Sequence, residues 1–485
     1  MRAWSRSMLL LLLAAYGGVL LLSQPAAVNG DGVGYLKQLC GDQLAPGHLA
    51  YMPLLRAIAA AIPHATPLDL VIPLRLLGLA CALLALGLLY DAALRLHGSA
   101  RAALFGTALL GLSHAFSRSA TEVEVYAPAA LLAVATLWAL ARHIVSPRPL
   151  WAVVAGLTAG VAVLFHLTLA LLAVPLLLLA RPRLSHLVAG LSAMGLAAGL
   201  PLALVLADHG SLAAAWAWLR SADHGIADPH GWSAPLIALW GLARSLVYVP
   251  YPYESSLALV APLSALAGAA LLALGLWAHR GRAALETRLL AFWSVPLALF
   301  AVLFFPSDTE RWIFVLPAVA LCLAPLASAV SPRWIGVLLA AMALTNLGLA
   351  RVPAALDRQP VERARAAERL LVPGALLVSP GHGWEELVGL GMATPPERFP
   401  LVHHVGAAGG LKPAIRQLQR RINATLASGH PVFVARMQDR SDPRGFKELA
   451  WFGMDRAGFA RLFEGYRAIP TGAPGLTRLL VSDKR

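Results

Sequence analysis

The loop that follows the N-terminal apolar stretch contains an acid well placed for catalysis. Asp31 lies just past that stretch, between Gly30 and Gly32. Glycines let the backbone turn sharply and let a substrate approach closely. A carboxylate at the edge of a low-dielectric region is suited to general-base chemistry. The structural alternative is an Asp in a turn that caps a helix beginning near Val33.

A second acidic loop has the sequence SRSATEVEVYAP. Glu122 and Glu124 lie in this loop, and Arg118 and His114 border it. Arg75 lies inside another apolar run, PLRLLGLAC. Ionisable residues in or beside a membrane are costly, so they indicate function by default. Two carboxylate loops and a buried Arg at similar depth predict one cavity for an anionic head group and an alcohol.

Several of these residues also have a structural interpretation. Snorkelling of the side chain to the outer interface explains Arg75 equally well. Glu122 is expected to be solvated rather than catalytic. Glu310 and Arg311, in the segment PSDTERW, fit an ordinary helix start with an exposed basic neighbour. The sequence leaves both interpretations open at these positions.

Membrane spans must position these side chains. Of the 485 residues, 58% are hydrophobic and 13% are charged, whereas a soluble protein has about 25% charged residues. Apolar runs of roughly twenty residues recur, and this length crosses about 30 Å of hydrocarbon. We therefore predict an all-α polytopic membrane protein with about 11 transmembrane helices plus interfacial helices.

The first span is expected to be an uncleaved N-terminal helix rather than a signal peptide, because many spans follow it. Residues 233–255 contain Arg244 and a cluster of Tyr and Trp, which favours a helix lying in the interface. Further spans are predicted near 68–90, 102–116, 124–142, 150–165, 167–180, 187–207, 256–278, 289–305, 312–330 and 334–351.

Charge segregation predicts the orientation. Basic residues concentrate on the cytoplasmic side of membrane proteins. With Met1 inside, the inner segments contain only two acids, Asp91 and Glu286. The basic residues of the same segments are Arg2, Arg6, Arg95, Arg101, Arg142, Arg148, Arg181, Arg183, Arg280, Arg282, Arg288 and Arg333. This pattern explains the net charge of +14 without nucleic-acid binding and places both acidic loops outside, on what would be a bacterial inner (plasma) membrane.

The composition changes after Arg351, where long apolar runs end. We predict a transmembrane domain over 1–353 and a small soluble extracytoplasmic α/β domain over 354–485. Within the latter, ALLVSP and PVFVARM are typical of short buried strands, and 411–428 and 445–464 have helical spacing. No G-x-G-x-x-G or P-loop sequence indicates nucleotide binding.

Metal-ligand spacing is missing from the sequence. Cys40, Cys81 and Cys322 are scattered along the chain, and His403 and His404 have no acid or Cys nearby at suitable spacing. We therefore predict neither a zinc site nor a disulfide framework.

Four stretches together resemble one enzyme superfamily. NGDGVGYL is similar to its acidic first-loop motif, and PGHLAYMPLLRAI is similar to the segment that follows. SHAFSRSATEVEVYAPAALLA is similar to a motif containing E-V-Y, and GLTAGVAVLFHLTLALLAVP to one with a His in a span. Over about its first 180 residues the chain thus resembles the GT-C membrane glycosyltransferases, which use lipid-phosphate sugars. The most similar branch contains the bacterial DUF2723 proteins and the protein O-mannosyltransferase-like group.

This resemblance gives roles to individual residues. It implies Asp31 as the catalytic acid of the first loop, with Glu124 as a second acid. Without the resemblance, His166 would be typical of a hydrogen-bonded core histidine. The residues expected to bind substrate are Tyr35, His48, Tyr51, Arg75, Arg118, Tyr126, His166 and Arg311.

The chain departs from the family pattern at three places. LAP (44–46) replaces the usual His-Pro-Pro, SR (117–118) replaces a Trp, and GY (34–35) stands where a Glu is often found. These departures leave the acceptor and metal dependence undetermined. No cofactor is required by the sequence, and a divalent cation stays compatible with the family.

The resemblance implies an inverting transfer of a sugar from a polyprenyl-phosphate donor to an acceptor hydroxyl on the outer face. The acceptor is a protein, a lipid or a glycan, and membrane lipids are the remaining partners. The alternative is a secondary transporter of a polar or anionic solute, although no inverted repeat is visible. A non-catalytic scaffold would lack a cavity that joins Asp31, Arg75 and Glu124.

Overall fold

A computed structural model of the chain describes most of its residues. The residues outside its description are 1, 29–30, 40–47, 63–66, 68, 182, 212, 215–216, 218–233, 250–265, 267–269, 271–272, 275–276, 278–283, 305, 307, 382, 391, 393–394, 438–445, 447–448, 450–451 and 482–485. The span predicted at 256–278 falls mostly outside the described residues.

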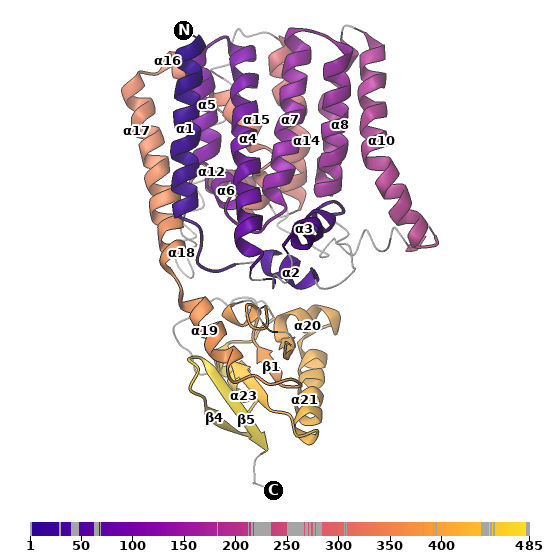
Figure 1. Cartoon of the computed structure of the whole chain (residues 1–485), viewed down its shortest axis with the longest axis vertical. Coiled ribbons are helices and arrows are strands. Elements are labelled where there is room, and N and C mark those ends of the chain that lie inside the picture. Colours follow the sequence, from indigo (N-terminus) through magenta and orange to yellow (C-terminus); the bar gives the residue numbers. More distant parts are fainter. Residues whose placement is uncertain are drawn as a thin grey trace. The chain divides into compact units, whose positions relative to one another are not determined.

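The chain divides into two compact units (Figure 1). Met1–Pro25, Gly41–Pro63 and Ile72–Ala354 form the first, which we call the helical unit. The second, the sheet unit, comprises Ala26–Cys40, His64–Val71 and Ala355–Arg485. The segment around Asp31 therefore belongs to the same unit as the C-terminal residues.

Within the described residues, five helical stretches are long and apolar enough to cross a membrane. They are Val71–His97 (α4), Tyr126–Val145 (α7), Leu184–Asp208 (α10), Leu285–Leu303 within α14 (Ala284–Leu303), and Pro332–Glu368. The last stretch contains α17 (Pro332–Ala343), the π-helix η5 (Leu344–Arg351), α18 (Val352–Leu356) and α19 (Gln359–Glu368). The predicted multi-pass membrane protein is confirmed, whereas the count of about 11 spans stays a prediction.

The helical unit also contains α1 (Arg2–Leu22), whose apolar part is Ser7–Leu22. Its shorter helices are α3 (Tyr51–Ala60), α5 (Ala100–Leu112), α6 (His114–Ser119), α8 (Pro149–Phe165), α12 (Ala234–Leu246), α15 (Leu316–Leu323) and α16 (Leu326–Ala329). With 13 residues, α12 is about 20 Å long, which is too short to cross the hydrocarbon alone.

The span predicted at 167–180 is not a continuous α-helix. It consists of η1 (Leu167–Leu172), a short α9 (Ala173–Leu176) and η2 (Leu177–Ala180), where η1 and η2 are 3₁₀-helices. Pro175 lies inside this stretch and has no backbone N–H to donate. Together with η1, the end of α8 lies beside the site described below.

Small residues allow α8 and α10 to pack closely. A Cβ atom added at Gly156 or Gly160 would overlap the backbone of α10, at Gly190 and Met194 respectively. Small residues four apart are typical of helix pairs in membranes, because they let the two backbones approach.

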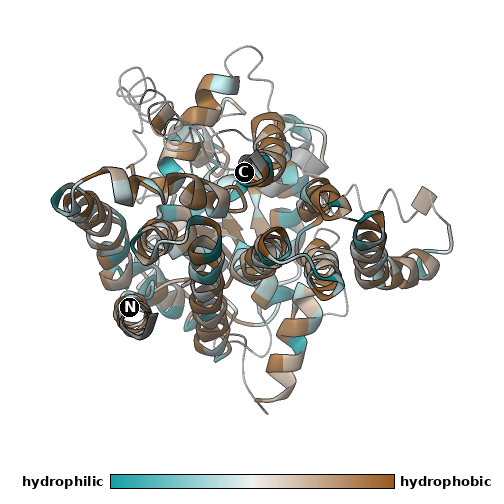
Figure 2. Cartoon of the chain, turned by 90° about the horizontal axis from the view of Figure 1, so that it is seen from above, coloured by the Kyte–Doolittle hydropathy of each residue, from teal (hydrophilic) through white to brown (hydrophobic). Residues whose placement is uncertain are grey.

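The outer surface of the helical unit is apolar. On α10, Leu196, Leu200 and Leu204 recur every fourth residue and are 72%, 65% and 67% exposed. Seen from above, brown hydrophobic colour covers most of the helices, including those at the periphery (Figure 2). Such a stripe of exposed leucines is what a lipid-facing helix requires.

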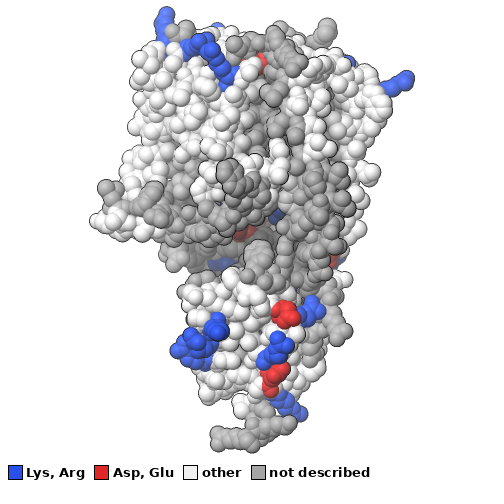
Figure 3. Space-filling model, turned by 180° about the vertical axis from the view of Figure 1, so that it is seen from behind, with Lys and Arg blue, Asp and Glu red and all other residues white. Residues whose placement is uncertain are grey.

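Basic side chains gather at the end of the helical unit where the N-terminus lies (Figure 3). At this end Arg101 donates to the carbonyl oxygen of Val330 over 2.9 Å, joining α5 to the end of α16. His97 forms a buried ion pair with Glu286 at 2.9 Å, joining α4 to α14. Both contacts link segments that the charge pattern assigns to the inner side.

The sheet unit contains a mixed five-stranded sheet in the order β2-β1-β3-β5-β4. Its strands are β1 (Leu376–Ser379), β2 (Glu397–Pro400), β3 (Val432–Ala435), β4 (Tyr466–Pro470) and β5 (Leu476–Val481). β1 pairs in parallel with β2 and β3, and β5 pairs antiparallel with β3 and β4.

The two predicted buried strands are confirmed as β1 and β3, in which every residue is buried. The other three strands were not predicted, because their exposed polar residues interrupt the apolar pattern. The remaining helices are α2 (Asp31–Gln38), α20 (Leu401–Ala407), α21 (Leu411–Ala427) and α23 (Arg456–Arg461). The predicted helix over 411–428 is confirmed as α21, and the one over 445–464 falls partly outside the described residues.

Candidate functional site

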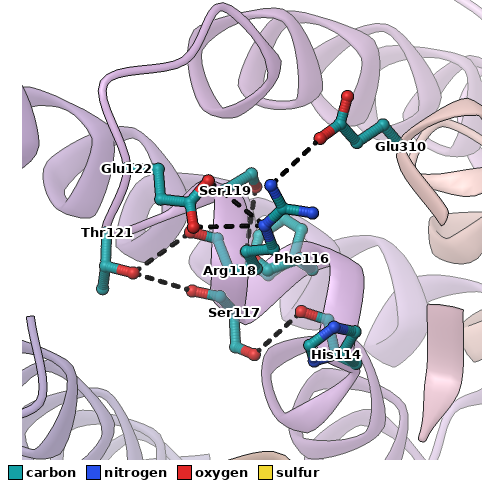
Figure 4. A network of polar contacts seen from close by, with 8 residues as sticks. All are labelled: His114, Phe116, Ser117, Arg118, Ser119, Thr121, Glu122 and Glu310. Carbon is teal, nitrogen blue, oxygen red and sulfur yellow. Dashed lines mark hydrogen bonds and ion pairs between the residues drawn. The ribbon is translucent and has the colours of Figure 1, made fainter. Parts of the chain in front are cut away.

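Arg118 lies between two carboxylates of the helical unit (Figure 4). Its Nε donates to both oxygens of Glu122, at 3.1 and 3.2 Å. Its Nη2 lies 3.4 Å from a carboxylate oxygen of Glu310, which belongs to the 3₁₀-helix η4 (Thr309–Trp312). The Glu122 carboxylate raises the pKa of the Arg118 guanidinium, so Arg118 is charged at any physiological pH. This triad ties the second acidic loop to the distant chain segment that contains Glu310.

Hydroxyl groups fix the shape of the loop that carries Arg118. Ser113 ends α5 in an extended conformation, and its Oγ donates to the carbonyl of Leu110 at 2.6 Å. Ser117 and Thr121 donate in the same way to the carbonyls of His114 and Arg118, both at 3.1 Å. These local bonds replace helical bonds where α5 ends, so the chain can turn and present Arg118.

Glu122 is buried, with 8% of its surface exposed. The expectation that it would be solvated is therefore wrong. Its negative charge attracts both Arg75 and Arg351 in addition to Arg118. A carboxylate among several guanidiniums is stabilised without contact with water, which composition alone does not reveal.

Arg75 is also buried, at 5% exposure, and its Nη1 donates to the carbonyl of Pro25 over 2.7 Å. The snorkelling interpretation is therefore wrong, since this guanidinium is held inside the protein. It ties the first turns of α4 to the chain just after α1.

Three residues predicted from separate motifs meet in one aromatic cluster. The ring of His166 lies 5.3 Å from that of His48 and 5.5 Å from that of Tyr126, between ring centroids. Phe314 completes the cluster, 5.1 Å from His166 and 6.1 Å from Tyr126. Such tilted and edge-on arrangements are typical of aromatic pairs.

The end of α8 positions this cluster. His166 follows the last residue of α8 in an extended conformation, with φ of −152°. His48 Nδ1 hydrogen-bonds to the carbonyl of Phe165 at 2.9 Å, and the N–H of Ala50 donates to Leu164 over the same distance. The chain just before α3 therefore provides hydrogen-bond partners for two carbonyls that have no helical partner at the end of α8.

A second charged group borders the cluster. Arg311 lies 3.6 Å from Asp308, whose side chain also caps η4 by accepting from the N–H of Glu310. Both Arg311 and Glu124 act electrostatically on Tyr126. Glu124 is buried and also acts on Tyr51, the first residue of α3.

The helical unit therefore brings together most of the predicted residues. Glu124, His48, Tyr51, Arg118, Tyr126, His166 and Arg311 form a continuous set of contacts and close charges. Arg75 joins this set through Glu122.

Asp31 and Tyr35 belong to the sheet unit, on α2. The helix begins at Asp31 itself, not near Val33 as the capping interpretation expected. Asp31 is exposed, whereas Tyr35 is 5% exposed and anchors the inner face of the helix with Leu36. A negative charge in the first turn is favourable because it faces the positive end of the helix dipole.

Sequence reasoning missed two residues of this region. Phe314 lies in the apolar stretch after η4 and carries no distinguishing signal. Asn346 is fully buried and makes four side-chain hydrogen bonds, two accepted from Tyr248 and Thr345 and two donated to Leu112 and Leu246. The sequence did carry a signal for Asn346, because a polar amide inside an apolar run is unusual and indicates a buried partner.

The described residues contain no group of three or more His, Cys, Asp or Glu side chains that could hold a metal ion. In this part of the chain the residues do not fit a metal site.

Residues 57–207 match a protein-family model described as Dolichyl-phosphate-mannose-protein mannosyltransferase. This segment contains Tyr126 and His166 of the aromatic cluster, together with Arg75, Arg118 and Glu124. A search of curated proteins finds no match to the chain.

The whole chain has the fold of solved membrane glycosyltransferases. It matches ArnT from Cupriavidus metallidurans bound to undecaprenyl phosphate with a TM-score of 0.58 and 15% identity, over 98% of both chains. It also matches the oligosaccharyltransferase of Archaeoglobus fulgidus with a TM-score of 0.58 and 13% identity, over 99% of this chain and 75% of that one.

These likenesses establish the fold, and the family model adds the class of the matched segment. Together they confirm the predicted enzyme class, a membrane glycosyltransferase of the GT-C type.

Proposed function

We propose that this protein transfers a sugar from a polyprenyl-phosphate carrier to an acceptor hydroxyl at the outer face of the membrane. The observation that carries the proposal is the buried cluster of His48, Tyr126 and His166 beside Arg311, formed by residues from distant motifs. Further support comes from the ArnT structure of the same fold, which is bound to undecaprenyl phosphate.

The reaction we propose inverts the anomeric carbon. The acceptor oxygen attacks this carbon while the bond to the donor phosphate oxygen breaks and its electron pair stays on the phosphate. Asp31 accepts the proton of the acceptor hydroxyl. Its exposure at the first position of α2 leaves the carboxylate open to an incoming hydroxyl.

The phosphate that leaves gains negative charge, which guanidinium groups offset by charge-assisted hydrogen bonds. Arg118, Arg75 and Arg311 were predicted for this role. Arg118 is already held by two carboxylates and Arg75 by a backbone carbonyl. We therefore assign Arg118 and Arg75 mainly to shaping the site, and Arg311, on the cluster side, to the substrate.

The aromatic cluster is proposed to hold the sugar. His166 is 5% exposed, and its Nδ1 has no hydrogen-bond partner among the residues that the structure describes. An unpaired buried nitrogen is costly unless a ligand satisfies it. A sugar hydroxyl would do so, while Tyr126 and Phe314 supply ring faces. Glu124 is proposed as the second acid, acting on a sugar hydroxyl rather than on the proton of the acceptor.

The narrower parts of the prediction belong to this proposal as well. They are the inner membrane of a bacterium, the extracytoplasmic position of the sheet unit, and the likeness to the DUF2723 branch. The segregation of basic residues to one end of the helical unit supports the orientation (Figure 3). The acceptor class is a protein, a lipid or a glycan.

The test is turnover by the purified full chain with a panel of polyprenyl-phosphate sugars. Consumption of one donor is expected. Positioned proton transfer contributes about 10²–10⁴-fold, so Asp31→Asn should lower kcat by that factor with little change in donor KM.

Asp69→Asn is the matched control, because Asp69 is another exposed acid of the sheet unit. It should retain full turnover. Full turnover by Asp31→Asn at normal expression would remove the base assignment, and failure of every donor would remove the proposed reaction.

A further inference from the structure

Arg351 is the last residue of the π-helix η5 and is buried, with 3% of its surface exposed. Its Nε and Nη2 atoms have no hydrogen-bond partner in the part of the chain that the structure describes. Burying an unpaired guanidinium costs several kcal/mol in a typical protein. A position of this kind therefore indicates a ligand that supplies the missing acceptors.

Glu122 does not supply the missing hydrogen-bond acceptors of Arg351. Glu122 attracts Arg351, but both of its oxygens already accept from Arg118. Arg118 itself repels Arg351. Nε and Nη2 of Arg351 thus have a compensating charge nearby and still no acceptor atom among the residues that the structure describes.

Two further buried polar atoms near Arg351 also lack partners. The hydroxyl of Tyr16, on α1, and Nδ1 of His114, on α6, have no hydrogen-bond partner among the described residues. Both groups lie at the end of α5, where Asn346 of η5 also binds. A Cβ added at Gly111 would lie 3.6 Å from the Tyr16 ring, Asn346 donates to the carbonyl of Leu112, and the His114 ring lies 5.1 Å from that of Tyr248. Three polar groups from the first helix, the second acidic loop and the last span therefore share one neighbourhood. A single acceptor-rich group would satisfy them when His114 carries its proton on Nδ1.

The π-helix η5 explains how Arg351 comes to point inward. Asn346 and Arg351 are five residues apart, so an α-helix at 100° per residue would turn them about 140° apart. The i→i+5 pattern of a π-helix places them on one side instead. Wide turns of this kind are frequently found at functional sites.

Asn346 fixes this turn. Its amide donates to the carbonyls of Leu112 and Leu246, at 2.6 and 2.7 Å, and its oxygen accepts from the N–H of Tyr248 at 2.6 Å. The ring of Tyr248 lies 5.1 Å from that of His114. The same residue therefore fixes both the π-helical turn and the support of His114.

We propose that Arg351, Tyr16 and His114 form a buried site for a phosphate group carried by a lipid. Arg351 ends the predicted last span, so its guanidinium is at the boundary where lipid phosphates lie. The two non-bridging phosphate oxygens of the donor, and the third that is freed when the sugar leaves, match the several N–H donors of Arg351 and the Tyr16 hydroxyl. Resting on the proposed function, we assign this phosphate to the sugar donor, where Arg351 holds the leaving group that Arg118 is not available to bind.

The experiment measures the thermal stabilisation of the purified full chain by undecaprenyl phosphate, undecaprenol, phosphatidylglycerol and inorganic phosphate. Only ligands with a phosphate group should stabilise the unaltered protein. Arg351→Met should raise the Kd for undecaprenyl phosphate about tenfold to a hundredfold, and Arg351→Lys should restore part of the affinity. Without ligand, the Tm of Arg351→Met should equal or exceed that of the unaltered chain, because an unpaired buried charge is removed.

Tyr16→Phe removes one hydroxyl and nothing else. It should raise the Kd up to about tenfold, with no loss of Tm in the absence of ligand. Arg333→Gln is the matched control, because Arg333 is exposed near the start of the same helical stretch. Its Kd should equal that of the unaltered chain.

Three results would overturn the site: equal stabilisation by undecaprenol and undecaprenyl phosphate, an unchanged Kd in Arg351→Met and Tyr16→Phe, or a Tm of ligand-free Arg351→Met well below that of the unaltered chain. Stabilisation by phosphatidylglycerol alone, lost in Arg351→Met, would support the site and remove its assignment to the sugar donor. Retained turnover in Asp31→Asn would remove only the catalytic base, so failure of the proposed function and failure of this site are distinguishable.

Discussion

The triad of Arg118, Glu122 and Glu310 allows a quantitative prediction. Replacing each residue by Gln, singly and in pairs, gives two double-mutant cycles that share Arg118. At an effective dielectric constant of about 20, the gross attraction is about 5 kcal/mol for either gap, 3.1 Å to Glu122 or 3.4 Å to Glu310. Distance therefore does not decide which contact contributes more to stability.

Burial and geometry decide it instead. The side chain of Glu122 is 9% exposed and accepts through both oxygens, whereas that of Glu310 is 27% exposed and makes a single contact. Hydrogen bonds to buried charged groups contribute about 1.5–3 kcal/mol, and partly exposed pairs about 0.2–1 kcal/mol. We expect a coupling free energy near 2 kcal/mol for Arg118 with Glu122 and below 1 kcal/mol for Arg118 with Glu310.

The measurement is the free energy of unfolding of each variant by reversible denaturation in mixed micelles. Raising the salt concentration should weaken the coupling to Glu310 more than the coupling to Glu122, because exposed pairs are screened more strongly. Equal couplings, or a larger one for Glu310, would refute the argument that burial governs this triad.

Two further predictions concern packing and the inner end of the helical unit. Gly156→Leu should destabilise the protein by about 1–3 kcal/mol through overlap with Gly190, measured as a loss of unfolding free energy. Gly199→Leu is its control and should be close to neutral, since a Cβ there meets open space. His97→Leu should lower the unfolding free energy by about 3–5 kcal/mol, since it removes the ion-pair partner of the buried Glu286 carboxylate. Glu286→Gln in the same background should recover part of that loss, and no recovery would contradict a direct pairing.

The candidate site shows how far residue types and spacing lead. The motifs around His48, Tyr126 and His166 predicted three residues that the structure gathers into one cluster. Sequence did not predict that Phe314 completes it, because one Phe in an apolar stretch looks like any other. Glu122 was misjudged for a related reason: a Glu in a loop has the same sequence signature whether water or Arg118 satisfies it.

The sequence by itself determined the membrane class, the apolar helices and the two buried strands of the sheet unit. Each of these follows from local patterns, because burial in lipid or in a sheet core requires continuous apolar runs. Tertiary structure alone decided which polar groups are satisfied. Among the described residues, Arg118 has two carboxylate partners and Arg351 has none of its own, although both are arginines beside apolar helices. Partners for buried charges come from residues distant in the chain, and no local pattern encodes that choice.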